Sequence, residues 1–100
     1  MPYIIETWDK PGSLALRRAT REAHLDYLDA HMARLLACRA KLADDGSDLG
    51  GGLYVLDVET RAEAEAFIAA DPFSTAGLFE RVQITRWRRA YLDGRSYISR

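Results

Sequence analysis

The sequence has few of the features that mark secreted, membrane or nucleic-acid-binding proteins. Cys38 is the only cysteine, so a disulfide framework within one chain is impossible. No apolar run approaches membrane-spanning length, and the first residues do not follow the pattern of a cleaved secretory leader. The net charge of −1 gives no general attraction to nucleic acid or anionic lipid. These absences predict a cytoplasmic protein with no membrane and no nucleic-acid partner.

The chain itself predicts one domain over residues 1–100, because 100 residues that are 48% hydrophobic and 29% charged suit one thin core. Four segments favour strands and two favour helices by composition and periodicity. Their order is strand, helix, strand, strand, helix, strand, which is typical of an α+β ferredoxin-like split βαβ domain. Such a domain has a four-stranded antiparallel sheet with both helices on one face. The expected strands are 3–8, 34–41, 53–58 and 79–87, and the expected helices are 14–32 and 60–70.

Two residues are expected to begin the helices. Ser13 is a suitable N-cap for the first helix, and Thr60 with Glu63 forms a capping-box pattern at the second. The first helix is apolar on two sides, and His24 lies on the edge between them, where a side chain faces a cleft. The core side of the second helix is expected to comprise Ala62, Ala66, Phe67 and Ala70.

The alternation along the first strand also predicts a partner. Tyr3, Ile5 and Thr7 fall on one side, and Ile4, Glu6 and Trp8 on the other, so neither side is wholly polar. Since the helices cover one face only, the second face must be solvated or buried. We therefore expect a homodimer, or a higher homo-oligomer, packed sheet to sheet.

The segment that follows the second helix carries the main candidate for chemistry. Asp71, Pro72 and Phe73 lie just before the last strand, and the fold can bring this connection close to the first helix. A carboxylate bound to one imidazole nitrogen of His24 leaves the other nitrogen available as a general base. The alternative is that Asp71 is only an N-cap followed by a first-position proline, with His24 a solvated or structural residue.

Other residue groups have simpler explanations. The glycines at 50–52 lack the ending of a phosphate loop and favour a flexible connection over 44–52. The aspartates of that connection lack the calcium-binding pattern, and His24, His31 and Cys38 lack zinc spacing, so no metal is predicted. Cys38 in an apolar strand is more typical of a small core residue than of a nucleophile.

The C-terminal residues are basic and aromatic. The run 86–89 could contact nucleic acid, but the balanced net charge favours a solvated strand end or a salt bridge between subunits. The tail that follows has turn chemistry at Asp93-Gly94 and apolar residues on both sides of the turn. We expect this tail to dock on its own domain or on a partner.

Three motifs in order resemble those of the YciI-like (YCII-related) proteins. Residues 21–28 resemble the pattern R-x-x-H-L-x-Y-L, and 44–46 with 50–52 resemble an Asp-Gly…Gly loop. Residues 71–78 are similar to the box D-P-F-x-x-A-G-L. The resemblance covers about residues 1–88 and leaves 89–100 as a tail. It departs from the family at Arg39-Ala40, where Gly-Pro is usual, which changes a pocket-side turn.

This resemblance implies a dimeric α+β barrel built from two ferredoxin-like domains, with a pocket between helix and sheet. It implies that His24 and Asp71 are the catalytic residues. One related branch is a dehydrochlorinase of chlorinated hydroxyquinols, and the wider fold group includes muconolactone isomerases. Both chemistries move a proton beside a carbonyl or enol and require no cofactor.

The first hypothesis is a cofactor-independent enzyme of lyase or isomerase type acting on an unknown small molecule. His24 is the general base, Asp71 orients it, and Arg17 or Arg21 binds an anionic group of the substrate. The second hypothesis is a non-catalytic small-molecule-binding or accessory domain that uses the same pocket. The third is a purely structural dimerisation module, whose pocket is filled by side chains.

Overall fold

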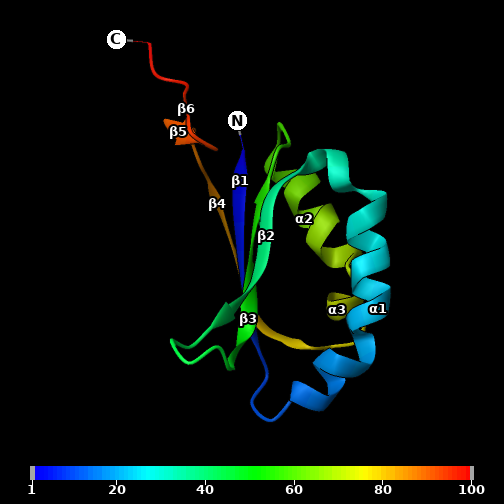
Figure 1. Cartoon of the computed structure of the whole chain (residues 1–100). Coiled ribbons are helices and arrows are strands. Elements are labelled where there is room, and N and C mark those ends of the chain that lie inside the picture. The colour runs from blue at the N-terminus through cyan, green and yellow to red at the C-terminus, as the bar shows by residue number, and fades with distance from the viewer. Residues whose placement is uncertain (1, 100) are drawn as a thin grey trace.

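The computed structural model describes residues 2–99 and contains a four-stranded antiparallel sheet with its helices on one face (Figure 1). The strand order is β2-β3-β1-β4, so the first and third strands lie at the centre. The expected α+β class and order of elements are confirmed. The strands are β1 Tyr3–Asp9, β2 Leu35–Leu42, β3 Asp48–Leu56 and β4 Phe79–Arg86.

The helices pack as one layer against the sheet (Figure 1). They are α1 Leu14–Ala30, the short 3-10 turn η1 Met32–Arg34, α2 Arg61–Ala70 and the one-turn helix α3 Pro72–Thr75. The hydroxyl of Tyr27 donates to the backbone oxygen of Phe67 at 2.7 Å, which ties α1 to α2. This contact lies one turn along α1 from His24, so it helps to fix the height of His24 above the sheet.

The helix starts differ in how they are capped. Thr60 Oγ1 accepts the backbone N–H of Glu63 at 3.2 Å, as the capping-box pattern predicts. Ser13 is the N-cap residue of α1, as predicted, but its side chain makes no hydrogen bond to the helix. Ser13 has φ −102° and ψ 15°, which is not the extended backbone that aims a capping oxygen into the helix.

The glycine-rich segment is a strand rather than a loop. β3 begins at Asp48, so only residues 43–47 connect it to β2, and the expected flexible connection over 44–52 is wrong. A Cβ at Gly51 would lie 2.1 Å from the backbone oxygen of Thr7, and Thr7 Oγ1 accepts the N–H of Gly52 at 2.9 Å. Glycine is required here because β1 and β3 approach so closely.

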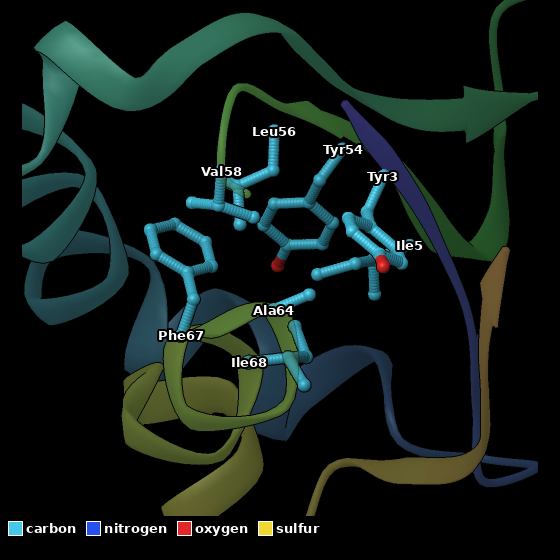
Figure 2. Packing of buried hydrophobic residues seen from close by; sticks show 8 residues of the cluster. All are labelled: Tyr3, Ile5, Tyr54, Leu56, Val58, Ala64, Phe67 and Ile68. Carbon is cyan, nitrogen blue, oxygen red and sulfur yellow. The ribbon is translucent and has the colours of Figure 1, made fainter. Parts of the chain in front are cut away.

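The core fills the space between the sheet and α2 (Figure 2). Ile5 and Thr7 are fully buried, as the alternation along β1 predicts. On α2 the buried residues are Ala64, Phe67 and Ile68, so only Phe67 of the expected set is correct. The cluster drawn in Figure 2 consists of Tyr3, Ile5, Tyr54, Leu56, Val58, Ala64, Phe67 and Ile68.

The opposite face of the sheet has no helix over it (Figure 1). Ile4 is paired with Val55 and lies on this face, together with Trp8 further along β1. Lys41 Nζ lies 4.1 Å from the centroid of the Trp8 ring, and Arg81 Cζ lies 4.4 Å from it. This uncovered face is therefore part apolar and part cationic, as expected for a mixed surface.

Beyond β4 the chain forms a second, two-stranded sheet of β5 Tyr91–Leu92 and β6 Arg95–Ser96. We call this sheet, together with its flanking residues over 88–99, the C-terminal hairpin. Its turn has positive φ at Asp93 and Gly94, as turn chemistry at this pair predicts. Figure 1 shows the hairpin beyond the end of β4, on the side of the sheet away from α1 and α2.

Candidate active site

A cavity of about 350 Å³ lies between α1 and the half of the sheet formed by β2 and β3. Its position matches the expected pocket between helix and sheet. The lining includes His24 from α1, Cys38 from β2, Tyr54 from β3 and Phe73 from α3. Four separate elements therefore converge on one space, and side chains do not fill it.

His24 and Asp71 are in direct contact beside this cavity. His24 Nδ1 lies 2.9 Å from each carboxylate oxygen of Asp71, although the residues are 47 positions apart. His24 is the one buried residue of α1, and Asp71 is fully buried. His24 lines the cavity, as expected for a residue that faces a cleft, whereas Leu14 and Leu16 on the two expected apolar sides of the helix are exposed.

Asp71 also caps the helix that follows it. Its Oδ1 accepts the backbone N–H of Phe73 at 2.9 Å, and Pro72 occupies the first turn of α3. Its Oδ2 accepts the hydroxyl of Tyr54 at 2.9 Å. The capping alternative and the His24 partnership are both true, because one carboxylate has enough lone pairs for three donors.

The hydrogen bonds determine which nitrogen of His24 is free. An ionised carboxylate only accepts hydrogen bonds, so Nδ1 must carry the proton that points at Asp71. In residues 2–99, every buried side-chain nitrogen or oxygen has a hydrogen-bond partner. His24 Nε2 has no such partner, so it is not buried and is accessible. His24 lines the cavity, so Nε2 is the ring nitrogen that remains available to a molecule bound there.

Two aromatic side chains hold the pair in place. The rings of His24 and Phe73 are stacked, with centroids 3.9 Å apart and planes at 17°. Burial, followed by the negative charge of Asp71, raises the pKa of Tyr54 far above its ordinary value. Tyr54 therefore stays a neutral donor to Asp71 and does not compete with His24 as a base.

Arg17 lines the cavity but its charge is already paired. Its Nε lies 2.6 Å from Asp9 Oδ2 and its Nη2 lies 3.1 Å from Asp9 Oδ1. Burial opposes the cation, but the hydrogen bond and charge of Asp9 prevail and raise the pKa of Arg17. Its guanidinium carbon also lies 4.7 Å from the centre of the Phe73 ring. This arginine supports the wall of the site.

Arg21 is the freer of the two predicted anion-binding arginines. It lines the same cavity, and its side chain is 63% exposed, with an ion pair to Glu22 at 3.7 Å. Such an exposed pair is weak and easily exchanged for a ligand. Arg18 and Arg39 also line the cavity, and no feature of the sequence distinguishes them from other surface arginines.

Several expectations about neighbouring residues need correction or completion. Arg39 and Ala40 lie inside β2, so the departure from the family pattern alters a strand at the cavity wall and not a turn. Cys38 lines the cavity, and burial, followed by the charge of Asp71, raises the pKa of its thiol to about 11. At neutral pH this thiol is protonated and a poor nucleophile.

His31 is not part of the site. Its Nδ1 lies 3.1 Å from Arg34 Nη2, and its ring packs on Tyr27 and Phe67. Within residues 2–99 no group of three or more His, Cys, Asp or Glu side chains could hold a metal ion. Over the same range, no helix is long and apolar enough to span a bilayer.

The sequence did not predict the contribution of Tyr54. The alternation along its strand places it on the same side as Leu56, which is the helix side, but this alone describes a core residue. Its functional position follows from the register of β3, which brings the hydroxyl to Asp71. One signal was available in the sequence: Tyr54 lies among aliphatic residues that face inward. Its hydroxyl is then expected to be buried, and a buried hydroxyl needs a hydrogen-bond partner.

Comparison with known proteins identifies the family. The YCII-related domain matches residues 1–88. Protein YciI of Escherichia coli O6:H1 is 32% identical over 98 residues, which cover 91% of this chain and 100% of YciI. Protein YciI of Shigella flexneri matches equally well. The chain belongs to the YCII-related family, as the three motifs indicate.

Solved structures give the same fold. The 5-chloro-2-hydroxyhydroquinone dehydrochlorinase TftG of Burkholderia phenoliruptrix AC1100, in complex with 2,5-dihydroxybenzoquinone, is 33% identical, with a TM-score of 0.81. The similarity covers 88% of this chain and 94% of that one. Protein Atu4242 of Agrobacterium tumefaciens shares the fold at 15% identity and a TM-score of 0.54, over 93% of this chain and 98% of its own.

Proposed function

We propose that this protein is a cofactor-independent enzyme that transfers a proton on a small molecule bound in the cavity beside His24. The observation that supports this most is the arrangement of the imidazole: Nδ1 contacts buried Asp71, Nε2 has no partner, and His24 lines the cavity. A base held in one tautomer by a carboxylate is suited to removing a proton beside a carbonyl or from an enol. Asp71 acts as the positioning residue.

The arginines favour an anionic or enolic substrate. Arg21 is exposed at the cavity and is available to bind a carboxylate or phenolate. Arg17 was predicted for the same role, but its pairing with Asp9 makes it a support for the wall. We assign the primary anion contact to Arg21, with Arg17 contributing positive potential from behind Phe73.

The similarity to TftG supports dehydrochlorination as the reaction to test first. In such a step His24 Nε2 takes a hydroxyl proton of the chlorinated hydroxyquinol and returns it to the chlorine-bearing ring carbon, which becomes tetrahedral as the neighbouring C–O becomes a carbonyl. Removal of a second hydroxyl proton by Nε2 then forms the other carbonyl, shifts a ring double bond toward the tetrahedral carbon and breaks the C–Cl bond, which leaves a hydroxybenzoquinone. Chloride leaves with the bonding electrons, so HCl is lost overall and no oxidant is consumed. Isomerisation of an enol or lactone uses the same base and returns the proton to another carbon.

The assay is chloride release from 5-chloro-2-hydroxyhydroquinone, with binding of 2,5-dihydroxybenzoquinone measured alongside. We expect His24→Gln to lower turnover by roughly 10²–10⁴-fold, the usual contribution of a general base. His31→Gln is the matched control and should leave the rate unchanged, because His31 lies outside the cavity lining. Equal turnover in His24→Gln and wild type would remove His24 from the mechanism.

The competing proposal is a non-catalytic binding or accessory domain that uses the same cavity. It predicts that a ring ligand binds, that the ligand is recovered unchanged, and that His24→Gln alters affinity alone. A structural module with a filled pocket is less well supported, because the cavity is open. We place either version in a reducing cytoplasm, as the single cysteine suggests.

We also propose that two copies form the dimeric α/β barrel by packing their uncovered sheet faces together. The apolar pair Ile4 and Val55, with Leu53 at 40% exposure beside them, supports burial of this face. Sedimentation at micromolar concentration tests the proposal. A monomeric mass would contradict it.

A further inference from the structure

The C-terminal hairpin presents apolar side chains to solvent. Tyr91 is 60% exposed, Tyr97 42% and Ile98 44%, within a segment of only a few residues. Two-stranded hairpins this short gain little stability from their own contacts. A cluster of exposed aromatic and aliphatic side chains on such an element favours a docking surface.

The contacts that shape the hairpin are internal to it. The N–H of Tyr97 donates to the backbone oxygen of Ala90 at 2.8 Å, and Arg89 Cζ lies 4.7 Å from the centroid of the Tyr97 ring. The connection to the domain runs through Trp87, whose N–H donates to the backbone oxygen of Pro2 at 2.9 Å. Docking of the tail on its own domain or on a partner therefore stays a prediction.

The charge of the chain is divided between the hairpin region and the rest. Residues 1–85 contain nine lysines and arginines against 14 aspartates and glutamates, a net charge of −5. Residues 86–100 contain five arginines against one aspartate, a net charge of +4. Such a segment is attracted to the acidic body of another copy of the same chain. An anionic nucleic acid would be repelled by that body, which makes it the weaker candidate.

The position of the hairpin agrees with this partner. It extends past the end of β4 and leans to the side of the uncovered sheet face (Figure 1). A molecule covering that face would lie beside the hairpin. We propose that the C-terminal hairpin is a clasp that binds the body of a second copy of this chain, with Tyr91, Tyr97 and Ile98 as apolar anchors and the arginines as complementary charges. The clasp is separate from the His24 chemistry, and the family match ends at residue 88, before the hairpin.

Two variants of the full chain test the clasp. One carries Tyr91→Ser, Tyr97→Ser and Ile98→Ser, and the other carries Arg88→Glu, Arg89→Glu and Arg95→Glu. The matched control is Leu49→Ser, an equally exposed apolar residue on the body at 63% exposure. Sedimentation equilibrium should show the dimer dissociation constant of each hairpin variant raised by about tenfold or more, because Tyr and Arg dominate such contacts. The control should match wild type, and salt should weaken the wild-type dimer.

A second measurement identifies the contact directly. A photo-crosslinking amino acid at position 91 of the otherwise native chain should yield crosslinked dimers whose second site lies in residues 1–85. Crosslinks confined to one chain would overturn the proposal, as would hairpin variants that dimerise like wild type. A monomeric wild type would overturn both the clasp and the sheet-to-sheet dimer, whereas unaffected hairpin variants would overturn the clasp alone. Binding of a single-stranded oligonucleotide that the Arg→Glu variant loses, without any change in dimerisation, would assign the hairpin to nucleic acid instead.

Discussion

Tyr54 and Asp71 are joined by a buried hydrogen bond of 2.9 Å from the phenol hydroxyl to Oδ2 of the carboxylate. The bond connects the central strand β3 to the start of α3. Asp71 also contacts Nδ1 of His24, which connects the same point to α1. Three elements distant in the sequence are thus fixed by one side chain. The same carboxylate both organises the fold at this point and determines the tautomer of the proposed base.

Tyr54→Phe should destabilise the protein by about 1.5–3 kcal/mol, because it removes a buried hydrogen bond to a charged group. Urea unfolding followed by circular dichroism measures the difference. Tyr3→Phe is the matched control: Tyr3 is a core tyrosine at 7% exposure on the neighbouring strand, and its hydroxyl is not buried without a partner. Equal free energies of unfolding for Tyr54→Phe and wild type would mean that the bond to Asp71 contributes nothing net.

Asp9→Asn should destabilise the protein by about 2 kcal/mol, since it leaves the Arg17 guanidinium largely buried without its counter-charge. The side chains of Arg17 and Asp9 are 13% and 6% exposed in this pair. Glu22→Gln serves as the control, because the pair of Glu22 with Arg21 is exposed and long, at 3.7 Å. Thermal unfolding should show a larger fall in Tm for Asp9→Asn than for Glu22→Gln. An equal fall in the two variants would show that the ion pair of Arg17 with Asp9 is as weak as a surface pair.

Cys38 should react slowly with iodoacetamide at neutral pH, because its thiol pKa is raised to about 11. At pH 8 the thiolate fraction is then about 0.1%, and the alkylation rate should rise about tenfold for each pH unit up to that pKa. The raised pKa also makes the free energy of unfolding fall as pH rises from the ordinary thiol range toward 11, since the unfolded chain loses its proton first. Cys38→Ala should lessen that fall.

A rate of alkylation at pH 8 equal to that of an unfolded cysteine peptide would contradict this account of Cys38. It would mean that the thiol is accessible and ordinary. The cavity wall formed by β2 would then be more open than its burial indicates.

The sequence predicts those parts of the fold that depend on local periodicity and capping. The alternation along β1 correctly places Ile5 and Thr7 inward. The capping box correctly marks the start of α2 at Thr60. Each of these features depends on residues within a few positions of one another, so one stretch of chain contains all the necessary information.

Features that depend on contacts across the fold were not predictable in the same way. Glycines weaken any strand pattern, and Gly51 and Gly52 belong to β3 only because β1 lies against them. The helix α2 is rich in alanine, and alanine is compatible with either the buried or the exposed face of a helix. The sequence therefore did not identify Ala64 as the alanine that is buried. Arg17 looked available for a substrate, because its pairing with Asp9 becomes visible only once the turn between them is folded.

The candidate site was partly predictable for the same reason. His24 and Asp71 could be proposed as partners from the order of elements, and the structure brings them into contact. Tyr54, the third member of the group, depends on strand register, which a short sequence pattern does not determine.

We propose that Asp71 holds His24 with a proton on Nδ1 and leaves Nε2 as the free nitrogen. Nitrogen-15 NMR of the two histidine rings tests it most directly, in wild type, in Asp71→Asn, and in His31→Gln to assign the signals. For neutral His24 we expect the tautomer protonated at Nδ1 in wild type, and a loss of this preference in Asp71→Asn. A neutral His24 protonated at Nε2, and unaffected by Asp71→Asn, would contradict the proposed base and its positioning residue together.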